Sequence, residues 1–302
     1  MPVIGHEKII SFFDRAIEGG KLSHAYCFSG CGSVGKRKIA KAIAAKIFGV
    51  EEEKLSSHPD FFCVERARDK KSGQLKKEVS KEQADGIKHS LQKKSWSAGG
   101  HQIVIVDEAE LLNEESSNAL LKTLEEPGGK NIIFLLTEND DTLLPTIKSR
   151  CQIFYFSLTS EKKIAEGLEK MGYDRKIADE VASFAWGRPG RAINFAADAN
   201  ALAEFKKQRE ILEKIVGEPF YRKMKEIEYI FEEKDEAVSV SEKLEKIFEV
   251  WTMWWRNKML SDKNEENKKQ AAKMIDKLKD AKIFLKQNIN PKLLVEQIVL
   301  GF

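Results

Sequence analysis

A glycine-rich string near the N-terminus has the residue types and spacing of a phosphate-binding loop. Residues 30–36 are Gly-Cys-Gly-Ser-Val-Gly-Lys, which follow a short apolar run and precede a segment with helical spacing. Glycines let backbone N–H groups curl round an anion, a helix start adds a favourable dipole, and Lys36 can reach terminal phosphates. Gly30, Gly32, Gly35 and Lys36 are therefore candidate ligands for ATP or ADP. A chance glycine-rich turn is the alternative.

The residue after Lys36 and the end of a later strand indicate whether the loop could hold Mg²⁺ together with a nucleotide. A hydroxyl for Mg²⁺ normally follows the lysine, but here Arg37 follows it, and arginine has no acceptor. The apolar run Ile103–Val106 ends in Asp107 and Glu108, which suit an acid holding the metal's water shell and an acid polarising the attacking water. An ordinary strand end followed by two acids, without any role in catalysis, explains the same pattern equally well. We expect Mg²⁺ binding to be weak or absent, and we assign no metal ligands.

These residues need a parallel sheet to bring them together. Strand-like apolar runs alternate with segments of helical spacing, which predicts a five-stranded parallel sheet with crossover helices. One helix is expected over Arg37–Phe48, and Asn113 is expected to cap another that ends before Pro127. The strands are expected at 25–29, 60–65, 102–106, 131–137 and 152–156.

The chain after Phe156 is expected to be all helix, broken at glycines and prolines. A buried stripe at three-and-four spacing and the neighbouring tryptophans are more typical of a core than of a base-stacking platform. The Lys-rich stretch 261–280 is typical of a solvated helix face, with the opposite charges of Glu265 and Lys269 four residues apart. The charged insertion 66–77 is expected to be an exposed hairpin or loop. The stripe is Leu244, Ile247, Phe248, Trp251 and Trp255, with Trp254 beside it.

Composition excludes several classes of protein. The chain has 302 residues, enough for two or three domains, and its net charge of +3 is too balanced to argue nucleic-acid binding by itself. Its four cysteines show no C-x-x-C spacing, so neither a disulfide framework nor a zinc site is indicated. No apolar run is long enough for a membrane span and no signal-peptide pattern is present, so we expect a cytoplasmic protein without membrane partners.

Two longer strings resemble a known family. Residues 118–127 (Asn-Ala-Leu-Leu-Lys-Thr-Leu-Glu-Glu-Pro) and 144–152 (Leu-Pro-Thr-Ile-Lys-Ser-Arg-Cys-Gln) are similar to the bacterial clamp-loader branch of the AAA+ ATPases, as are His24-Ala-Tyr and His58-Pro-Asp. The similarity runs from about Ile4 to Phe195. It implies an AAA+ P-loop domain over 1–157, a small helical lid domain over 158–204 and an all-α collar domain for oligomerisation over 205–302.

The resemblance also implies roles for single residues. In such proteins the Ser-Arg-Cys string presents an arginine to the ATP of the neighbouring subunit, which would make Arg150 a trans-acting finger; an ordinary pair with a carboxylate is the alternative. Thr137 holds the first sensor position, although a buried strand-end threonine is equally ordinary. At the second sensor, Gly190 falls where motor subunits carry arginine, and neither Arg188 nor Arg191 matches that position. Residues 51–59 lack the cysteines of the zinc cluster found in many relatives, so no zinc is expected.

The Pro-Gly pattern at the second sensor is similar to the delta-prime branch of this family. The resemblance implies a largely non-hydrolysing stator of the DNA polymerase III clamp loader, with weak or absent ATPase activity and no required cofactor. Its partners would be motor (gamma/tau) and delta subunits in a heteropentamer, and through that complex the sliding clamp and primed DNA. A motor ATPase of the same family is one alternative. A stand-alone nucleic-acid-binding P-loop protein, suggested by the basic residues of 66–94, is another.

Overall fold

A computed structural model describes residues 3–65, 86–87, 90, 95–96, 100–126, 130–232, 240–286 and 289–302. Its described residues fall into two compact units, one ending at Asp198 and one covering Ala199–Phe302, and each is described by itself. The predicted division into three domains stays a prediction. The insertion 66–77 lies outside the described residues.

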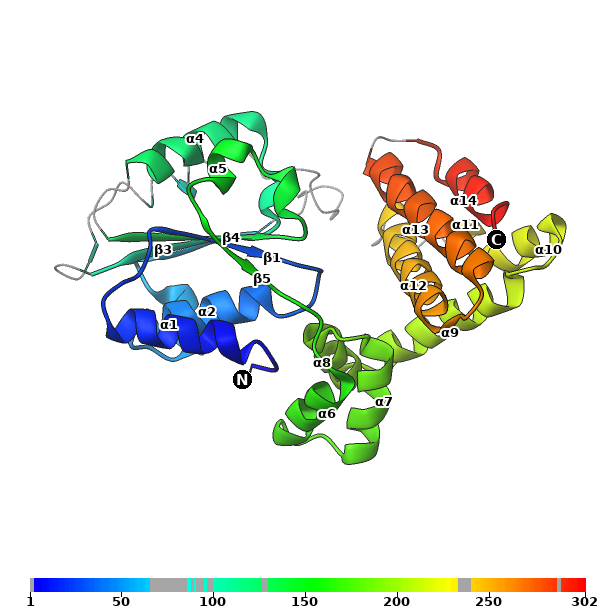
Figure 1. The fold of residues 1–302 in the computed structure, drawn as a ribbon, viewed down its shortest axis with the longest axis horizontal. Coiled ribbons are helices and arrows are strands. Elements are labelled where there is room, and N and C mark those ends of the chain that lie inside the picture. Colours follow the sequence, from blue (N-terminus) through cyan, green and yellow to red (C-terminus); the bar gives the residue numbers. More distant parts are fainter. Residues whose placement is uncertain are drawn as a thin grey trace. The chain divides into compact units, whose positions relative to one another are not determined.

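The first unit is built on a parallel sheet with the strand order β2-β3-β4-β1-β5 (Figure 1). The predicted fold class is confirmed, and the strand bounds agree with the expected ones to within one residue. Ser29, the last residue of the central β1, lies in register with Thr137 on one side and Tyr155 on the other. The strands are β1 (Ala25–Ser29), β2 (Phe61–Val64), β3 (Gln102–Val106), β4 (Asn131–Thr137) and β5 (Gln152–Tyr155).

Helices cover both faces of this sheet because each face is apolar. Helices α1 (Glu7–Glu18) and α2 (Lys36–Phe48) pack on one face, and α4 (Glu114–Glu125) and α5 (Pro145–Lys148) lie on the other (Figure 1). Asn113 caps α4 as predicted, its side chain accepting a hydrogen bond from the Ser116 N–H at 2.8 Å. Short 3₁₀ turns follow at η1 (Glu52–Ser57), η2 (Ala109–Leu111) and η3 (Asp140–Thr142).

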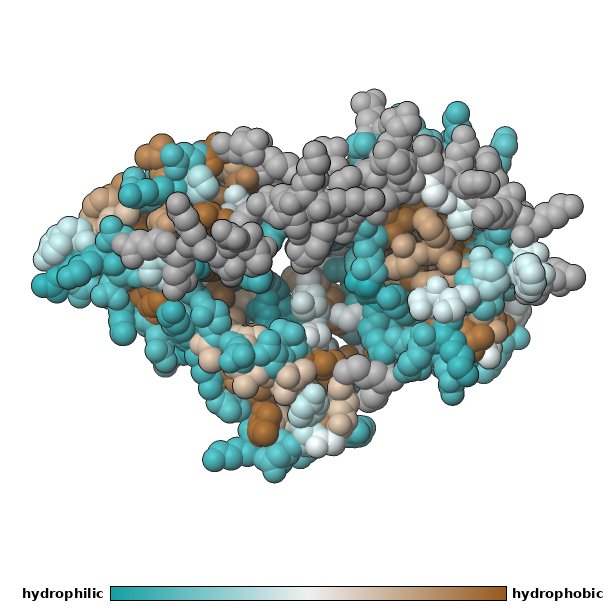
Figure 2. Space-filling model, turned by 180° about the vertical axis from the view of Figure 1, so that it is seen from behind, coloured by the Kyte–Doolittle hydropathy of each residue, from teal (hydrophilic) through white to brown (hydrophobic). Residues whose placement is uncertain are grey.

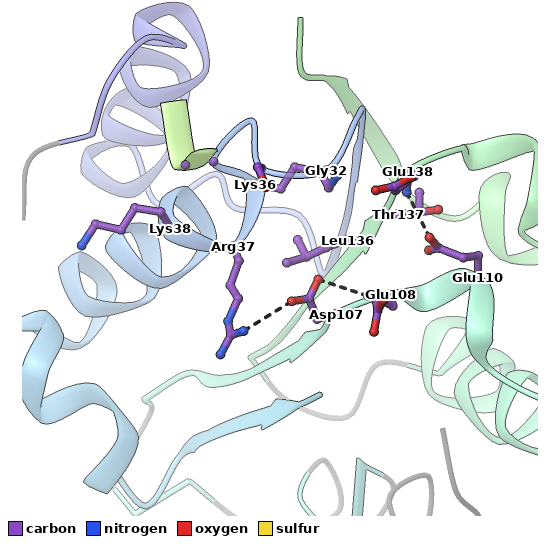
Figure 3. Close-up of a pocket in the computed structure, with 13 residues that line it drawn as sticks. Gly32, Lys36, Arg37, Lys38, Asp107, Glu108, Glu110, Leu136, Thr137 and Glu138 are labelled. Atoms are coloured by element: carbon purple, nitrogen blue, oxygen red, sulfur yellow. Dashed lines mark hydrogen bonds and ion pairs between the residues drawn. The ribbon is translucent and has the colours of Figure 1, made fainter. Parts of the chain in front are cut away.

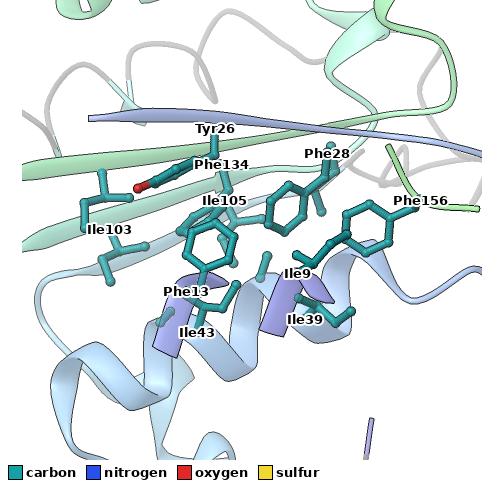
Figure 4. Close-up of a cluster of buried hydrophobic side chains, with 14 of the residues drawn as sticks. Ile9, Phe13, Tyr26, Phe28, Ile39, Ile43, Ile103, Ile105, Phe134 and Phe156 are labelled. Atoms are coloured by element: carbon teal, nitrogen blue, oxygen red, sulfur yellow. The ribbon is translucent and has the colours of Figure 1, made fainter. Parts of the chain in front are cut away.

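An aromatic cluster, together with isoleucines of both helices, fills the space between the sheet and helices α1 and α2 (Figure 4). Phe13 of α1 is fully buried, and its ring centroid lies 4.8 Å from that of Tyr26 and 5.8 Å from that of Phe134. The opposite layer is aliphatic and includes Leu120 of α4 and Ile147 of α5. These two layers fix the strand ends that carry the functional residues.

Three helices complete the first unit: α6 (Glu161–Lys170), α7 (Arg175–Ala185) and α8 (Pro189–Ala197). Pro189 occupies the first helical position of α8, where its missing N–H costs no hydrogen bond. Gly187 before it has a φ of 75°, a left-handed conformation that favours glycine. The Gly-x-Pro-Gly string therefore fixes where α8 begins.

The second unit is helical throughout its described residues. The predicted stripe on α12 is buried, but Trp254 is only half-buried, because it precedes Trp255 by one position and so lies about 100° round the helix. Its indole N–H donates to Glu213 Oε1 at 3.1 Å. Glu265 pairs with Lys268 rather than with Lys269. The helices are α9 (Ala199–Ile215), α10 (Phe220–Ile227), α11 (Tyr229–Glu232), α12 (Val240–Ser261), α13 (Glu265–Lys286) and α14 (Pro291–Val299).

The described surface of both units is mainly hydrophilic, and hydrophobic residues gather in smaller patches (Figure 2). Across the part of the chain that the structure describes, no helix combines the length and apolarity needed to cross a membrane.

Phe13→Ala should lower the free energy of unfolding of the first unit by about 3–5 kcal/mol, because it empties the centre of the aromatic cluster. Ile177→Ala on α7, whose side chain is 45% exposed, should change it by less than about 0.5 kcal/mol. Hydrogen exchange of the β1 and β4 amides in urea measures both. Equal protection in the two variants would contradict this assignment of the core.

Candidate functional site

The carboxyl ends of β1, β3 and β4 surround a cavity of about 350 Å³ (Figure 3). Parallel strands end at one edge of a sheet, so the loop after β1, the acids after β3 and the last residue of β4 meet there. The structure thus places most of the residues that the sequence predicted around one cavity; Gly30 and Arg150 are not among its lining residues. The lining residues are Gly32, Ser33, Gly35, Lys36, Arg37, Lys38, Asp107, Glu108, Glu110, Leu136, Thr137, Glu138 and Gly190.

The glycine-rich loop has the backbone shape that its sequence requires. Gly35, the residue before α2, has a φ of 106°, which a side chain would strain. Lys36 is buried, and its ammonium group donates to the carbonyl oxygens of Gly30 and, at 2.9 Å, of Cys31. Burial lowers the pKa of Lys36, while the carboxylates of Glu138 and Glu110 oppose that shift. A phosphate would have to replace bonds that the lysine already makes to its own loop.

Arg37 lies between the loop and the end of β3. Its guanidinium donates to Glu65 Oε1 and approaches Asp107 Oδ2 at 3.7 Å (Figure 3). Burial raises the pKa of Asp107, and the Arg37 cation opposes that shift. A guanidinium offers Mg²⁺ no oxygen ligand, and its charge repels a second cation from the same carboxylate. The residues at this position therefore do not fit the metal that usually accompanies a bound nucleoside triphosphate.

The pocket also contains more acid than the sequence analysis identified. Glu138 points toward the loop, so that a Cβ added to Gly32 would lie 2.6 Å from Glu138 Oε1 (Figure 3). Glu110 accepts a hydrogen bond from the Glu138 N–H at 3.3 Å. Two further carboxylates, Asp107 and Glu108, line the same cavity and add to the negative charge. Glu138 follows Thr137 directly, and that adjacency could have identified it from the sequence.

Thr137 is buried at the end of β4, where its hydroxyl group belongs to a turn. The hydroxyl donates to the Asn139 carbonyl at 3.0 Å and accepts from the Asn139 N–H at 3.2 Å. These bonds are those of an ordinary strand-end threonine, although the residue also lines the cavity. A role as first sensor stays a prediction.

The start of α8 closes one side of the cavity without bringing a charge to it. The Gly190 N–H donates to the Ser33 carbonyl at 2.8 Å, and an added Cβ would lie 2.9 Å from that oxygen. A larger side chain here would have to displace the loop. Of the described residues at this turn, Gly190 lines the cavity and neither Arg188 nor Arg191 does.

Arg150 lies in the turn after α5, away from the cavity-lining residues. Its Nη2 is 2.9 Å from Glu125 Oε1 at the end of α4, and its Nη1 donates to the Thr146 carbonyl at 2.9 Å. The predicted alternative, a pair with a carboxylate, is therefore present in this chain. Because 35% of the arginine side chain and 51% of the glutamate side chain are exposed, the pair is worth at most about 1 kcal/mol.

Comparisons with known proteins are consistent with this arrangement. Residues 5–160, slightly more than half of the chain, match the family model described as DNA polymerase III, delta subunit. The chain is 30% identical over 191 residues to the DNA polymerase III subunit tau of Escherichia coli. That match covers 59% of this chain and 28% of the tau subunit. It is 30% identical over 149 residues to the DNA polymerase III subunit delta' of Pseudomonas aeruginosa. That match covers 44% of this chain and 43% of the delta' subunit.

A solved structure extends the likeness of fold to nearly the whole chain. The DNA polymerase III gamma subunit-related protein of Thermotoga maritima superposes with a TM-score of 0.50 at 16% identity, covering 95% of this chain and 97% of that one. At this identity the likeness concerns the fold alone. The chain spans less than two thirds of the length of the tau and delta' relatives that it matches.

Arg37→Thr should introduce Mg²⁺-dependent binding of ATP, because it removes the guanidinium and supplies a hydroxyl at the position that normally carries one. The affinity in Mg²⁺ should rise at least about tenfold, or 1.4 kcal/mol, over that in EDTA. Titration of a fluorescent ATP analogue measures it.

Lys38→Thr is the matched control. It removes a neighbouring cation that lines the pocket, but its hydroxyl stands at position 38 and not at position 37, where the metal ligand belongs. An equal gain in both variants would show that charge alone decides binding, and strong Mg²⁺ dependence in the unaltered protein would contradict the assignment to Arg37.

Proposed function

The chain belongs to the DNA polymerase III delta subunit family of clamp-loader AAA+ proteins, and on that premise we propose that it is a delta-prime-like stator that hydrolyses little or no ATP. The observation that carries this proposal is the Arg37 guanidinium beside Asp107. A motor subunit needs a metal there, because Mg²⁺ neutralises the charge that develops on the transferred phosphoryl group. This chain has a cation of its own at that point.

Two further features of the pocket support the proposal. Glu138 presents a carboxylate to the loop that would hold phosphates, and like charges repel at such short range. Gly190 abuts Ser33 where a motor would present an arginine. ATP or ADP binding is still compatible with the intact loop, but no nucleotide is required for the work of a stator. Arg37 in α2, Glu138 after β4 and Gly190 in α8 belong to different elements. Each of them would disfavour ATP hydrolysis in this pocket.

Arg150 gives the stator a role in a neighbour's reaction. It lies on a turn at the surface, outside its own pocket, and its pair with Glu125 is solvent-exposed and weak. Arginine is suited to stabilising phosphoryl charge across an interface because its planar guanidinium donates several hydrogen bonds at once. We assign Arg150 as the finger that reaches the ATP of an adjacent motor subunit.

The partners follow from the same assignment. Relatives of this chain are named tau, gamma and delta' subunits of DNA polymerase III, so the motor partner would be of the gamma/tau type. A ring with motor and delta subunits would then bring this chain to the sliding clamp and primed DNA. The helical second unit would serve as the collar in that ring.

A motor ATPase remains the second candidate, because Lys36, Asp107, Glu108 and Thr137 share one cavity and the tau subunit is among the relatives. The isolated chain should show no ATP turnover above that of its Lys36→Ala variant, since the Arg37 cation lies beside Asp107, where a motor subunit needs a metal. Phosphate release with Mg²⁺ and primed DNA measures it. Turnover that Lys36→Ala abolishes would favour the motor over the stator.

Arg150→Ala should slow hydrolysis at the neighbouring ATP site of a reconstituted complex by about 10³-fold, because the developing charge loses its guanidinium. DNA-stimulated phosphate release and clamp loading on primed DNA measure the effect. Arg150→Lys should recover little of the rate, since an ammonium cannot reproduce the planar fork.

Arg175→Ala is the control for loss of a surface arginine. Arg175 pairs with Glu169 and Asp179 on its own chain, in α6 and α7, and its loss should leave both rates unchanged. Normal rates in Arg150→Ala would remove the finger from the proposal.

A further inference from the structure

A buried carboxylate joins three elements close to Arg150. Asp140, in η3, is only 6% exposed. Its Oδ1 accepts from Ser29 Oγ at 2.8 Å, and its Oδ2 lies 2.5 Å from Lys148 Nζ and accepts from Tyr155 OH at 3.3 Å. These partners belong to β1, α5 and β5, and with Asp140 they form what we name the Asp140 network. None of the sequence motifs includes Asp140, although Lys148 belongs to the 144–152 string.

One end of the Asp140 network holds the turn that carries Arg150. Lys148 is the last residue of α5, a helix of four residues. A single helical turn is not stable by itself, so its position depends on what it contacts. The backbone then continues in tight turns, with Arg150 N–H donating to the Ile147 carbonyl at 3.1 Å and Cys151 N–H to the Lys148 carbonyl at 3.3 Å. A movement of Lys148 is therefore transmitted to Arg150 over two residues.

The other end of the network is fixed to the sheet. Ser29 directly precedes Gly30 and lies in register with Thr137 and Tyr155, so it is held by the ladders of the central strand. Burial of a carboxylate is costly unless the charge is paired and hydrogen-bonded, and here both conditions are met. The hydrogen bond from Lys148, helped by that from Ser29, holds the pKa of Asp140 below its usual range despite burial. The carboxylate is thus charged at neutral pH.

We propose that Asp140 is a positioning residue for Arg150: through Lys148 it fastens the Arg150 turn to the end of β1. The inference rests on the proposed action of Arg150 in trans. All four groups of the network belong to this chain and none of them lines the nucleotide cavity. The turn is therefore held in place whether or not this chain binds a nucleotide, which suits a subunit whose own pocket has lost its metal position.

Asp141 provides a matched control for the charge on Lys148. It also lies within reach of Lys148, with its Oδ1 2.7 Å from Nζ, but 79% of its side chain is exposed, and its carboxylate makes no hydrogen bond to the strand residues that the structure describes. Exposed ion pairs of this kind contribute little to stability, because water screens the two charges and both side chains lose conformational freedom. Comparing variants of Asp140 and Asp141 therefore distinguishes the anchoring of Lys148 to the sheet from the effect of a nearby negative charge.

The test compares Asp140→Asn, Asp141→Asn, Arg150→Ala and the double variant Asp140→Asn/Arg150→Ala in the reconstituted clamp-loader complex. Asparagine retains an acceptor for Ser29 but loses the charge that holds Lys148. DNA-stimulated ATP hydrolysis gives kcat and KM for each complex. Asp140→Asn should lower kcat at least about tenfold with KM changed less than about twofold, since a misplaced finger weakens mainly the transition state. Asp141→Asn should stay within about twofold of the unaltered complex.

The double variant distinguishes positioning from a general structural role. If Asp140 acts through Arg150, Asp140→Asn should add less than about a twofold loss to that of Arg150→Ala. A further loss equal to that of the single variant would overturn the inference, as would an unaltered kcat in Asp140→Asn when Arg150→Ala is slow. Normal rates in Arg150→Ala would instead refute the proposed function.

Lys148→Met covers the case in which Asp140→Asn does not fold, which circular dichroism would show. It removes the other half of the pair while keeping the aliphatic stem of the side chain. The same loss of kcat is expected, and it should again disappear in the Arg150→Ala background. A kcat equal to that of the unaltered complex would overturn the inference.

Discussion

The register of the central strand determines where everything else in the first unit lies. Ser29 ends β1 opposite Thr137 of β4 and Tyr155 of β5, and all three strands point the same way. The loop after β1 therefore opens beside the end of β4, and the segment between β4 and β5, which contains η3 and α5, must cross back to the opposite edge, where β5 starts. The cavity, the turn of Arg150 and the Asp140 network all follow from this register. A slip of one residue would turn each of these side chains to the other face.

Charge decides what the cavity can do. A loop with this backbone attracts anions, but its lysine is already bonded to its own carbonyls, and Arg37 and Glu138 place a cation and an anion within the space of metal and phosphate. A carboxylate such as Glu138 repels a phosphate at short range, and a guanidinium such as Arg37 repels a metal ion. Arg150, by contrast, does not line the cavity, and its pair with Glu125 is partly exposed to solvent. The proposed stator would act through this arginine rather than through its own pocket.

Much of the fold was predictable because its signals are local. Apolar runs bounded by turn residues located the strands, Asn113 marked a helix start, and three-and-four spacing identified the buried face of α12. The failures were equally physical. Trp254 resembles its neighbours in type but lies at the flank of the stripe, and Glu265 found Lys268 instead of Lys269 because either neighbour lies on the same helical face.

The sequence by itself determined the family, the sheet and the identity of the altered positions, because a glycine string, an arginine after a lysine and a Ser-Arg-Cys string can each be recognised over a few adjacent residues. Only the tertiary structure decided what those positions contact. Asp107 is 70 residues from Arg37 (107 minus 37), and Ser29 is 111 residues from Asp140. Such pairs form because parallel strands end at a common edge, and spacing along the chain does not encode which two side chains will meet there.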